Sequence, residues 1–269
     1  MSCDVSVVIP VFNSSGTLRR ALDSIYGQSL LPREIVIVDD GGSDWEESKQ
    51  IAASYPNNIS VRFIRLEQNQ GVSVARNTGV KASNCRYISF LDSDEVWFKE
   101  KVEVQYLFMV HNKIDFSMHG LIEPPTYPWS NTGAKNDVIP LWIPLASWSL
   151  LFKNRCTSTV MVLREKMVPF DSSLRRIEDW KCWMEVLSQD RLTSAYIRRT
   201  LAKRFKPGLG TSGLSQDVKA MHTSRMIALK RLINEDKITI YQFLVGICME
   251  SAKYPLRIII IALSRRGVT

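Results

Sequence analysis

The sequence predicts an α/β protein with a mostly parallel, Rossmann-like central sheet flanked by helices. Short, nearly continuous aliphatic runs recur along its first third, and such runs are typical of parallel strands that are buried on both faces. Amphipathic stretches separate these runs, as expected of the crossover helices of a parallel sheet. At 269 residues, the chain is long enough for one large domain with a small appendage.

The predicted elements alternate along the chain. The strands are expected at residues 5–11, 34–38, 61–66 and 86–91, and the helices between them at 17–26, 44–55 and 72–82. A helix is expected at 97–112, a long loop at 123–144, a strand at 158–163, a helix at 179–189 and a flexible loop at 207–215. We expect residues 1–215 to form the main domain, in halves of about 1–110 and 111–215, and residues 216–269 to form a C-terminal helical extension.

Composition indicates an ordinary globular protein, with 45% hydrophobic and 23% charged residues. Five scattered cysteines without a CxxC pair favour reduced thiols in a cytoplasm over a disulfide framework or a zinc site. The net charge of +8 suits phosphorylated substrates or an anionic membrane surface, and no nucleic-acid-binding motif accompanies it. The first strand begins next to Met1, so we expect no signal peptide.

Acidic residues follow two of the predicted strands directly. Asp39 and Asp40 end the second strand, and Asp92 and Asp94 end the fourth. Ligands of parallel α/β sheets bind beyond the carboxyl ends of the strands, where these side chains can converge. Residues two apart on an extended chain point the same way, and two adjacent carboxylates repel unless a cation separates them. Mg²⁺ bound to substrate phosphates is a natural partner for such a pair, so a nucleotide-diphosphate enzyme is indicated.

Four ordered motifs carry a resemblance to a known family. They are Val5-Ser6-Val7-Val8-Ile9-Pro10-Val11-Phe12-Asn13, Asp39-Asp40-Gly41-Gly42-Ser43-Asp44, Asn69-Gln70-Gly71 followed by Arg76, and Asp92-Ser93-Asp94. Together they resemble the N-terminal half of the family-2 glycosyltransferases, which have the GT-A fold. The resemblance covers residues 4–110 and extends more weakly to 215 through residues 158–161 and 176–180.

The resemblance implies a site for a UDP-sugar and a divalent ion, Mn²⁺ or Mg²⁺. Asp94 would hold the ion, and Asp92 would contact the ribose or the ion. One of Asp39 and Asp40, with Asp40 favoured, would read the uracil. The remaining residues expected at the donor are Pro10, Phe12, Asn13, Asn69, Gly71, Arg76 and Ser93.

Simpler interpretations of three donor residues stay open. Phe12, expected to stack on the base, is equally typical of a core residue. Arg76, expected to donate to base or phosphate, is also typical of a surface arginine. The Asp39–Asp40 pair could belong to a plain turn in which Asp44 caps the next helix.

On the acceptor side, the resemblance implies Asp179 as the catalytic base, with Glu178 as the alternative. Helix-starting acids are also common as N-caps. Trp180 and its neighbour Trp183 are expected either to form a wall for the acceptor sugar or to pack in the core. Arg204 and Lys206 would bind a diphosphate, or would belong to a solvated basic face.

The function implied is that of an inverting glycosyltransferase acting on a saccharide acceptor. The acceptor is expected to be linked to a lipid diphosphate, in the synthesis of O-antigen, capsule or exopolysaccharide at the cytoplasmic side of the cell membrane. The apolar residues 256–263 are too short to span a bilayer, which needs about 20 residues; they predict either an interfacial segment or a packed helix. The alternatives are a nucleotidyltransferase and a non-catalytic membrane-associated scaffold of the same fold.

Overall fold

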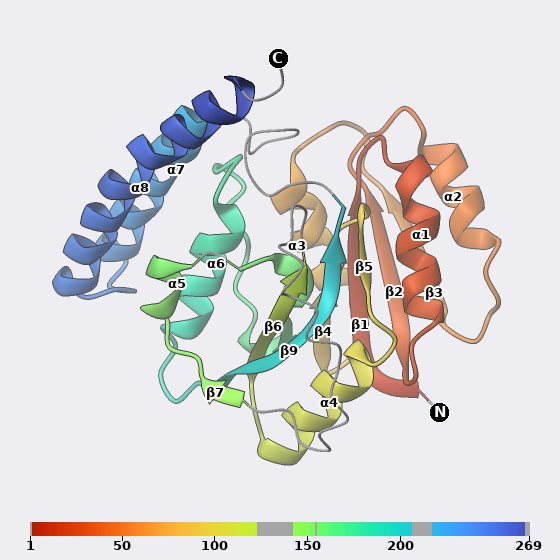
Figure 1. Ribbon diagram of the computed structural model, residues 1–269. Coiled ribbons are helices and arrows are strands. Elements are labelled where there is room, and N and C mark those ends of the chain that lie inside the picture. The colour runs from red at the N-terminus through yellow and green to blue at the C-terminus, as the bar shows by residue number, and fades with distance from the viewer. Residues whose placement is uncertain (1, 123–141, 154, 206–216, 267–269) are drawn as a thin grey trace.

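The computed structural model describes residues 2–122, 142–153, 155–205 and 217–266 (Figure 1). In chain order the first half contains β1 (Ser2–Val11), α1 (Ser15–Tyr26), β2 (Leu31–Asp39), α2 (Trp45–Ala53), β3 (Ser60–Arg65), α3 (Val72–Ala82), β4 (Tyr87–Phe90), β5 (Glu95–Trp97) and α4 (Lys101–Asn112). The second half contains β6 (Phe116–Ile122), β7 (Trp142–Pro144), α5 (Ser149–Phe152), β8 (Met161–Leu163), α6 (Glu178–Leu187), β9 (Ser194–Arg204), α7 (Val218–Asn234) and α8 (Ile240–Arg266). Short 3₁₀ turns flank β8 at Thr157–Thr159 and Arg164–Lys166.

The described strands form one sheet in the order β3-β2-β1-β4-β8-β6-β9-β5, and β7 pairs with β9. The parallel arrangement expected from the sequence is confirmed for β3, β2, β1 and β4. Beyond β4 the sheet is mixed, because β8 runs antiparallel to both β4 and β6, while β6 and β9 are parallel. The α/β class with helices on both faces is therefore confirmed, although parallel pairing is confined to half of the sheet and to the β6–β9 pair.

Side chains of β1 alternate between two cores. Val7 and Ile9 pack on one face with α1, α2 and α4, whereas Val8 packs on the other face with the apolar side of α6 and α7. Ala75 of α3 joins this second face over β2. Both faces are apolar because both are covered, which explains the nearly continuous aliphatic run in the sequence.

Two segments differ from the sequence-based expectation. The predicted helix at 97–112 begins at Lys101, because Glu95–Trp97 form an edge strand on β9. Residues 194–204 form the long strand β9, which was not among the expected strands. Basic side chains are interspersed with the apolar ones in β9, so it lacks the aliphatic pattern of the other strands. The expected loops at 123–144 and 207–215 lie almost wholly outside the described residues, apart from β7.

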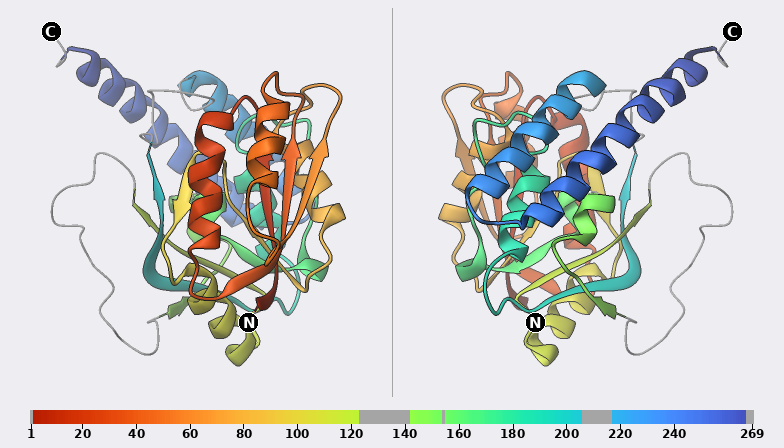
Figure 2. Two further views of the ribbon diagram at one scale, coloured as in Figure 1. Left: turned by 90° about the vertical axis from the view of Figure 1, so that its right-hand side faces the viewer. Right: turned by 90° about the vertical axis from the view of Figure 1, so that its left-hand side faces the viewer.

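The helices α7 and α8 pack side by side, with α7 against α6 and α8 against α5 (Figures 1 and 2). The C-terminal half of α8 projects beyond the body of the molecule (Figure 2). α8 continues as one helix through Pro255. Across the described parts of the chain, no helix combines the length and the apolar character needed to cross a membrane.

Candidate active site

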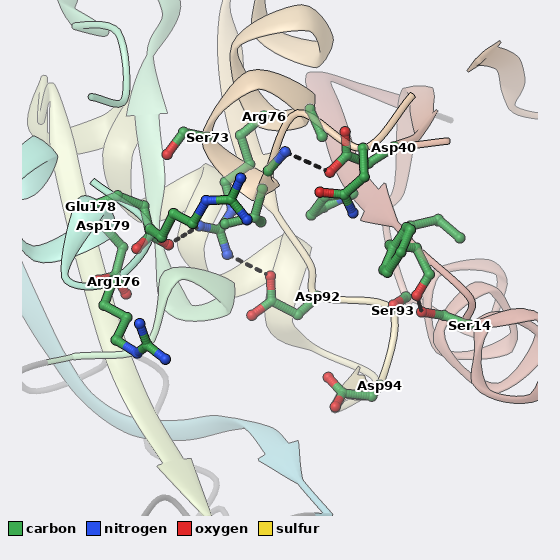
Figure 3. Close-up of a pocket in the computed structure, with 18 of the residues that line it drawn as sticks. Ser14, Asp40, Ser73, Arg76, Asp92, Ser93, Asp94, Arg176, Glu178 and Asp179 are labelled. Atoms are coloured by element: carbon green, nitrogen blue, oxygen red, sulfur yellow. Dashed lines mark hydrogen bonds and ion pairs between the residues drawn. The ribbon is translucent and has the colours of Figure 1, made fainter. Parts of the chain in front are cut away.

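A cavity of about 810 Å³ opens at the carboxyl ends of β1, β2 and β4 (Figure 3). The segments 69–76 and 172–179 close its sides. Most of the residues predicted to bind the donor line it: Pro10, Phe12, Asn13, Asp40, Asn69, Gly71, Arg76, Asp92, Ser93 and Asp94. Glu178, Asp179 and Arg204 line it as well. Strand ends that are distant in the sequence therefore meet at one site, as parallel topology requires.

Phe12 and Asp40 form one end of the cavity. The Phe12 side chain is 45% exposed, so the interpretation of Phe12 as a core residue is wrong, and its ring is available to stack. The two carboxylate oxygens of Asp40 accept the backbone N–H groups of Gln70 and Gly71, each at 2.8 Å. Gly71 has φ +97°, a conformation that favours glycine. Asp40 thus holds the 69–71 segment against the cavity.

Asp39 and Asn13 organise the neighbouring turn. Asp39 is fully buried and accepts the Gly42 N–H at 2.9 Å, and it does not line the cavity. Burial raises the pKa of its carboxyl group. Asn13 adopts φ +49° and its Oδ1 accepts the Ser43 N–H at 2.8 Å. Of the two acids at the end of β2, Asp40 is therefore the one that lines the cavity.

Asp92 and Asp94 lie in a turn, because β4 ends at Phe90 and the Glu95 N–H donates to the Asp92 carbonyl at 3.0 Å. The expectation of an extended segment is wrong at this point, yet both acids line the cavity (Figure 3). Ser158 holds the turn in place, since its hydroxyl accepts a hydrogen bond from the Asp92 N–H at 3.0 Å. Asp92 keeps its carboxylate 27% exposed.

Arg76 connects the two halves of the site. It is buried, so the interpretation of Arg76 as a surface arginine is wrong, and it bonds Asp92 Oδ1 at 2.8 Å and Glu178 Oε1 at 3.1 Å. Burial, and then the charge of Asp179, raise the pKa of Glu178 to about 7, while Arg76 opposes that shift. Arg76 therefore contacts an acid from β4 and an acid from α6 at once.

Asp179 is the second residue of α6 rather than its N-cap, which is Ile177. Its carboxylate is half-buried at the cavity. One oxygen accepts the Trp180 N–H at 2.6 Å and the other the Thr157 hydroxyl at 3.2 Å. Glu178, by contrast, is 7% exposed and bonded to Arg76. Asp179 is thus the more accessible of the two candidate bases.

Trp180 and Trp183 pack in the core and do not line the cavity. The Trp180 indole N–H donates to the Leu150 carbonyl at 2.9 Å. The proposed acceptor wall of tryptophans is therefore wrong, because the apolar face of α6 turns both rings toward the sheet and the C-terminal helices.

Arg204 ends β9 at the rim of the cavity and pairs with Glu95 at 2.6 Å. Glu95, Asp92 and Cys156 form a cluster whose ligand atoms lie within 4.8 Å of one another. Burial is the largest cause that raises the pKa of Glu95 and of the Cys156 thiol. Lys206, the second predicted phosphate ligand, lies outside the described residues.

The structure adds cavity residues that sequence reasoning missed. Arg175 and Arg176 precede the α6 acids and line the cavity, as does Met221 of α7. The basic pair Arg175-Arg176, separated from Glu178-Asp179 only by Ile177, was a usable signal. Met221 carried none, because only the packing of α7 on α6 brings it there.

Comparisons with known proteins agree with this geometry. Residues 6–165 match the family described as "Glycosyl transferase family 2". An Escherichia coli protein, "UDP-Glc:alpha-D-GlcNAc-diphosphoundecaprenol beta-1,3-glucosyltransferase WfgD", is 29% identical over 193 residues, covering 71% of this chain and 72% of its own. An uncharacterized glycosyltransferase of Rickettsia prowazekii is 28% identical over 265 residues, covering 91% and 79%.

Solved structures share the fold. The crystal structure of Staphylococcus aureus TarS residues 1–349 matches 87% of this chain and 66% of that chain, with a TM-score of 0.66 and 18% identity. TarS has also been solved in complex with UDP-GlcNAc, with a TM-score of 0.67 to this chain. The chain thus spans just under two thirds of the TarS fragment.

Proposed function

This chain belongs to glycosyltransferase family 2, and we propose that it transfers a sugar from a UDP-sugar to an acceptor hydroxyl with inversion. The observation that carries the proposal is the shared cavity, in which Phe12, Asp40, the Asp92–Asp94 turn and Asp179 face one space. A base-stacking ring, an acceptor for a base N–H, a cation-binding pair and a carboxylate base are the groups that such a reaction needs.

The donor would lie across the strand ends with its uracil on Phe12. Asp40 carries two carboxylate oxygens that each accept one backbone N–H, so each keeps a lone pair for the uracil N–H. The UDP-sugar class is supported by the name of the E. coli relative and by the TarS complexes with UDP and UDP-GlcNAc. Neither relative fixes which sugar this chain uses.

Asp92 and Asp94 fit a divalent ion, Mn²⁺ or Mg²⁺. Both present carboxylate oxygens to the cavity, the ligands that such hard cations prefer. The alternative cluster of Asp92 with Glu95 and Cys156 fits less well, because the Glu95 side chain is only 2% exposed, whereas that of Asp92 is 27% exposed. When bound, the ion would supply Lewis-acid stabilisation of charge on the departing diphosphate.

Asp179 would act as the base. It would take the proton of the acceptor hydroxyl as that oxygen forms a bond to the sugar C1. The bond from C1 to the diphosphate oxygen breaks on the opposite face, and its electron pair leaves with UDP. Arg76 would hold Asp92 and Glu178 in fixed positions on either side of this reaction centre, because it bonds both.

The acceptor is proposed to be a saccharide on a lipid diphosphate, in bacterial surface-polysaccharide synthesis at the cytoplasmic side of the membrane. The name of the E. coli relative describes such an acceptor, and a Bacillus subtilis relative, 35% identical over 117 residues, is named as a putative teichuronic acid biosynthesis glycosyltransferase. Arg175 and Arg176 at the acceptor side of the cavity would suit its phosphates, since arginine binds phosphate oxygens in pairs.

Peripheral membrane contact is proposed for the outer face of α8. Five large apolar side chains are exposed between positions 240 and 258 of this helix: Ile240, Tyr241, Leu244, Leu256 and Ile258. The charged residues between positions 240 and 258 instead turn inward: Glu250 is buried, Arg257 bonds it at 2.6 Å, and Lys253 donates to the Phe152 carbonyl at 2.7 Å. An apolar outer face over a net charge of +8 suits an anionic bilayer surface.

Co-sedimentation with phosphatidylglycerol vesicles tests the membrane proposal. Leu244→Glu should reduce the vesicle-bound fraction several-fold, whereas Leu107→Glu, an equivalent change on the exposed face of α4, should leave it unchanged. Equal binding of the two variants would contradict a role for α8.

The two alternative functions were a nucleotidyltransferase and a non-catalytic scaffold. Membership of glycosyltransferase family 2 argues against a nucleotidyltransferase. A non-catalytic scaffold of the same fold would have no need for a cavity that keeps Asp94 and Asp179 together, so the enzyme is favoured.

The deciding experiment combines titration calorimetry of UDP with a transfer assay. UDP-sugars are tested against a synthetic GlcNAc-diphosphate-lipid, and NMR of the product reports the anomeric configuration. Asp94→Ala should abolish Mn²⁺-dependent UDP binding. Asp179→Asn should keep UDP binding and lower kcat about 10²–10⁴-fold, while Asp190→Asn, outside the cavity, serves as the control. Wild-type turnover by Asp179→Asn, or a retained configuration, would overturn the mechanism.

A further inference from the structure

Arg225 of α7 packs on Trp180, the residue that follows the proposed base in α6. It is 8% exposed, and its guanidinium carbon lies 3.9 Å from the centre of the Trp180 ring. Trp180 follows Asp179 in α6, and its backbone N–H donates to the Asp179 carboxylate at 2.6 Å. A cation from the C-terminal helices is therefore packed against the residue that holds the base.

Glu250 of α8 fixes Arg225 from the other side. Its carboxylate is 5% exposed, and Oε2 lies 4.0 Å from Arg225 Nε. The other oxygen bonds Arg257 at 2.6 Å and lies 3.5 Å from His222 Nδ1. Contacts thus run without interruption from α8 through Arg225 to Trp180 at the first turn of α6.

A buried charge at this position calls for a reason beyond packing. Burial lowers the pKa of Arg225 to about 10, while Glu250 and then Asp179 oppose that shift. Arg225 therefore stays charged at neutral pH although its burial is costly. An apolar side chain would cover the Trp180 ring without that cost. What an apolar side chain would not supply is a positive charge near the Asp179 carboxylate.

We infer that Arg225, held by Glu250, is a positioning residue for Asp179. It clamps Trp180, which fixes the first turn of α6, and it places a positive charge that interacts with the carboxylate proposed to accept a proton. The inference rests on the proposed role of Asp179. It also makes α7 and α8 part of the catalytic unit, in keeping with Met221 of α7 lining the cavity.

Steady-state kinetics of the full chain separate positioning from general stabilisation. Arg225→Met should lower kcat about tenfold or more and leave the KM for the UDP-sugar within about twofold, because the donor end of the cavity is untouched. Arg225→Lys should recover much of kcat, and Glu250→Gln should give an intermediate loss. Leu232→Val, a core change in α7, controls for loosening of the helix and should leave kcat unchanged.

A second measurement does not depend on transferase activity. In the Asp179→Cys variant, the rate of alkylation of the introduced thiol by iodoacetamide is followed against pH by peptide mass spectrometry. Adding Arg225→Met should move that curve about half a pH unit or more to higher pH, because a nearby cation favours the thiolate. The other charged groups around position 179 are Glu178, Arg76 and Arg176 (Figure 3), and they are the same in both backgrounds.

The two measurements distinguish the possible failures. Superimposable alkylation curves, or a kcat for Arg225→Met equal to that of the wild type, would overturn the inference and leave the proposed function standing. A wild-type protein that transfers no sugar would overturn the proposed function, and the alkylation curves would still decide whether Arg225 acts on position 179.

Discussion

Glu178 offers a sharp test of the electrostatics, because its burial predicts an unusual pH dependence of stability. It is 7% exposed, and burial together with Asp179 raises its pKa to about 7 from an ordinary value of 4.5. The folded protein therefore binds a proton on Glu178 between these pH values, whereas the unfolded chain does not. Stability from this group is present at low pH and is lost as pH rises from about 4.5 to about 7.

The magnitude follows from the size of the shift. Each pKa unit is worth about 1.4 kcal/mol, so the shift from 4.5 to about 7 corresponds to a loss of about 3 kcal/mol across this range. Glu178→Gln replaces the neutral acid with an amide of nearly the same shape and cannot titrate. The variant should therefore match the wild type near pH 4.5 and be about 3 kcal/mol more stable at pH 8.

Urea unfolding at intervals from pH 4.5 to 8 measures this difference. With an m-value of about 3 kcal/mol per molar, the unfolding midpoint of Glu178→Gln should exceed that of the wild type by about 1 M urea at pH 8. Glu165→Gln, the same exchange at an exposed position, is the control, and its curve should run parallel to that of the wild type. A constant difference between Glu178→Gln and the wild type, or one that grows toward low pH, would refute the reasoning.

Three further predictions concern base stacking, a buried amine and a helix contact. Phe12→Ala should weaken UDP binding by about 1–3 kcal/mol, because base–aromatic stacking has that magnitude; calorimetry showing unchanged affinity would place the uracil elsewhere. Lys101 is fully buried against the Ser89 hydroxyl and the Trp97 ring, and burial holds its pKa well below the ordinary value. Lys101→Met should therefore stabilise the fold by about 1–3 kcal/mol near pH 6. This gain should shrink toward pH 10, because the unfolded wild-type chain then loses the proton that the buried amine does not carry, and wild-type stability rises. A loss of stability in urea unfolding that does not depend on pH would contradict this. Gly79→Ala should destabilise the fold by about 1–3 kcal/mol, because an added Cβ would lie 2.4 Å from Val8 Cγ1; an unchanged unfolding midpoint would show that α3 can shift away from β1.

The sequence by itself determined the parallel half of the sheet and the donor side of the site. β1, β2 and β4 are aliphatic runs followed closely by residues that line the cavity, as Val38 is followed two positions later by Asp40. Parallel topology brings all such strand ends to one edge, so local pattern was enough to place Phe12, Asp40 and Asp92 together. The pattern failed where strands mix basic and apolar residues, as in β9.

Tertiary structure alone decided which of the neighbouring candidates line the cavity. Asp39 and Asp40 are adjacent in sequence, yet one is buried under the turn and the other borders the cavity. Trp180 is buried outside the cavity, and the packing of α7 against α6 places Arg225 on its ring. These outcomes depend on contacts between residues that are far apart in the chain. A local sequence pattern cannot predict the burial and electrostatic energies of such contacts.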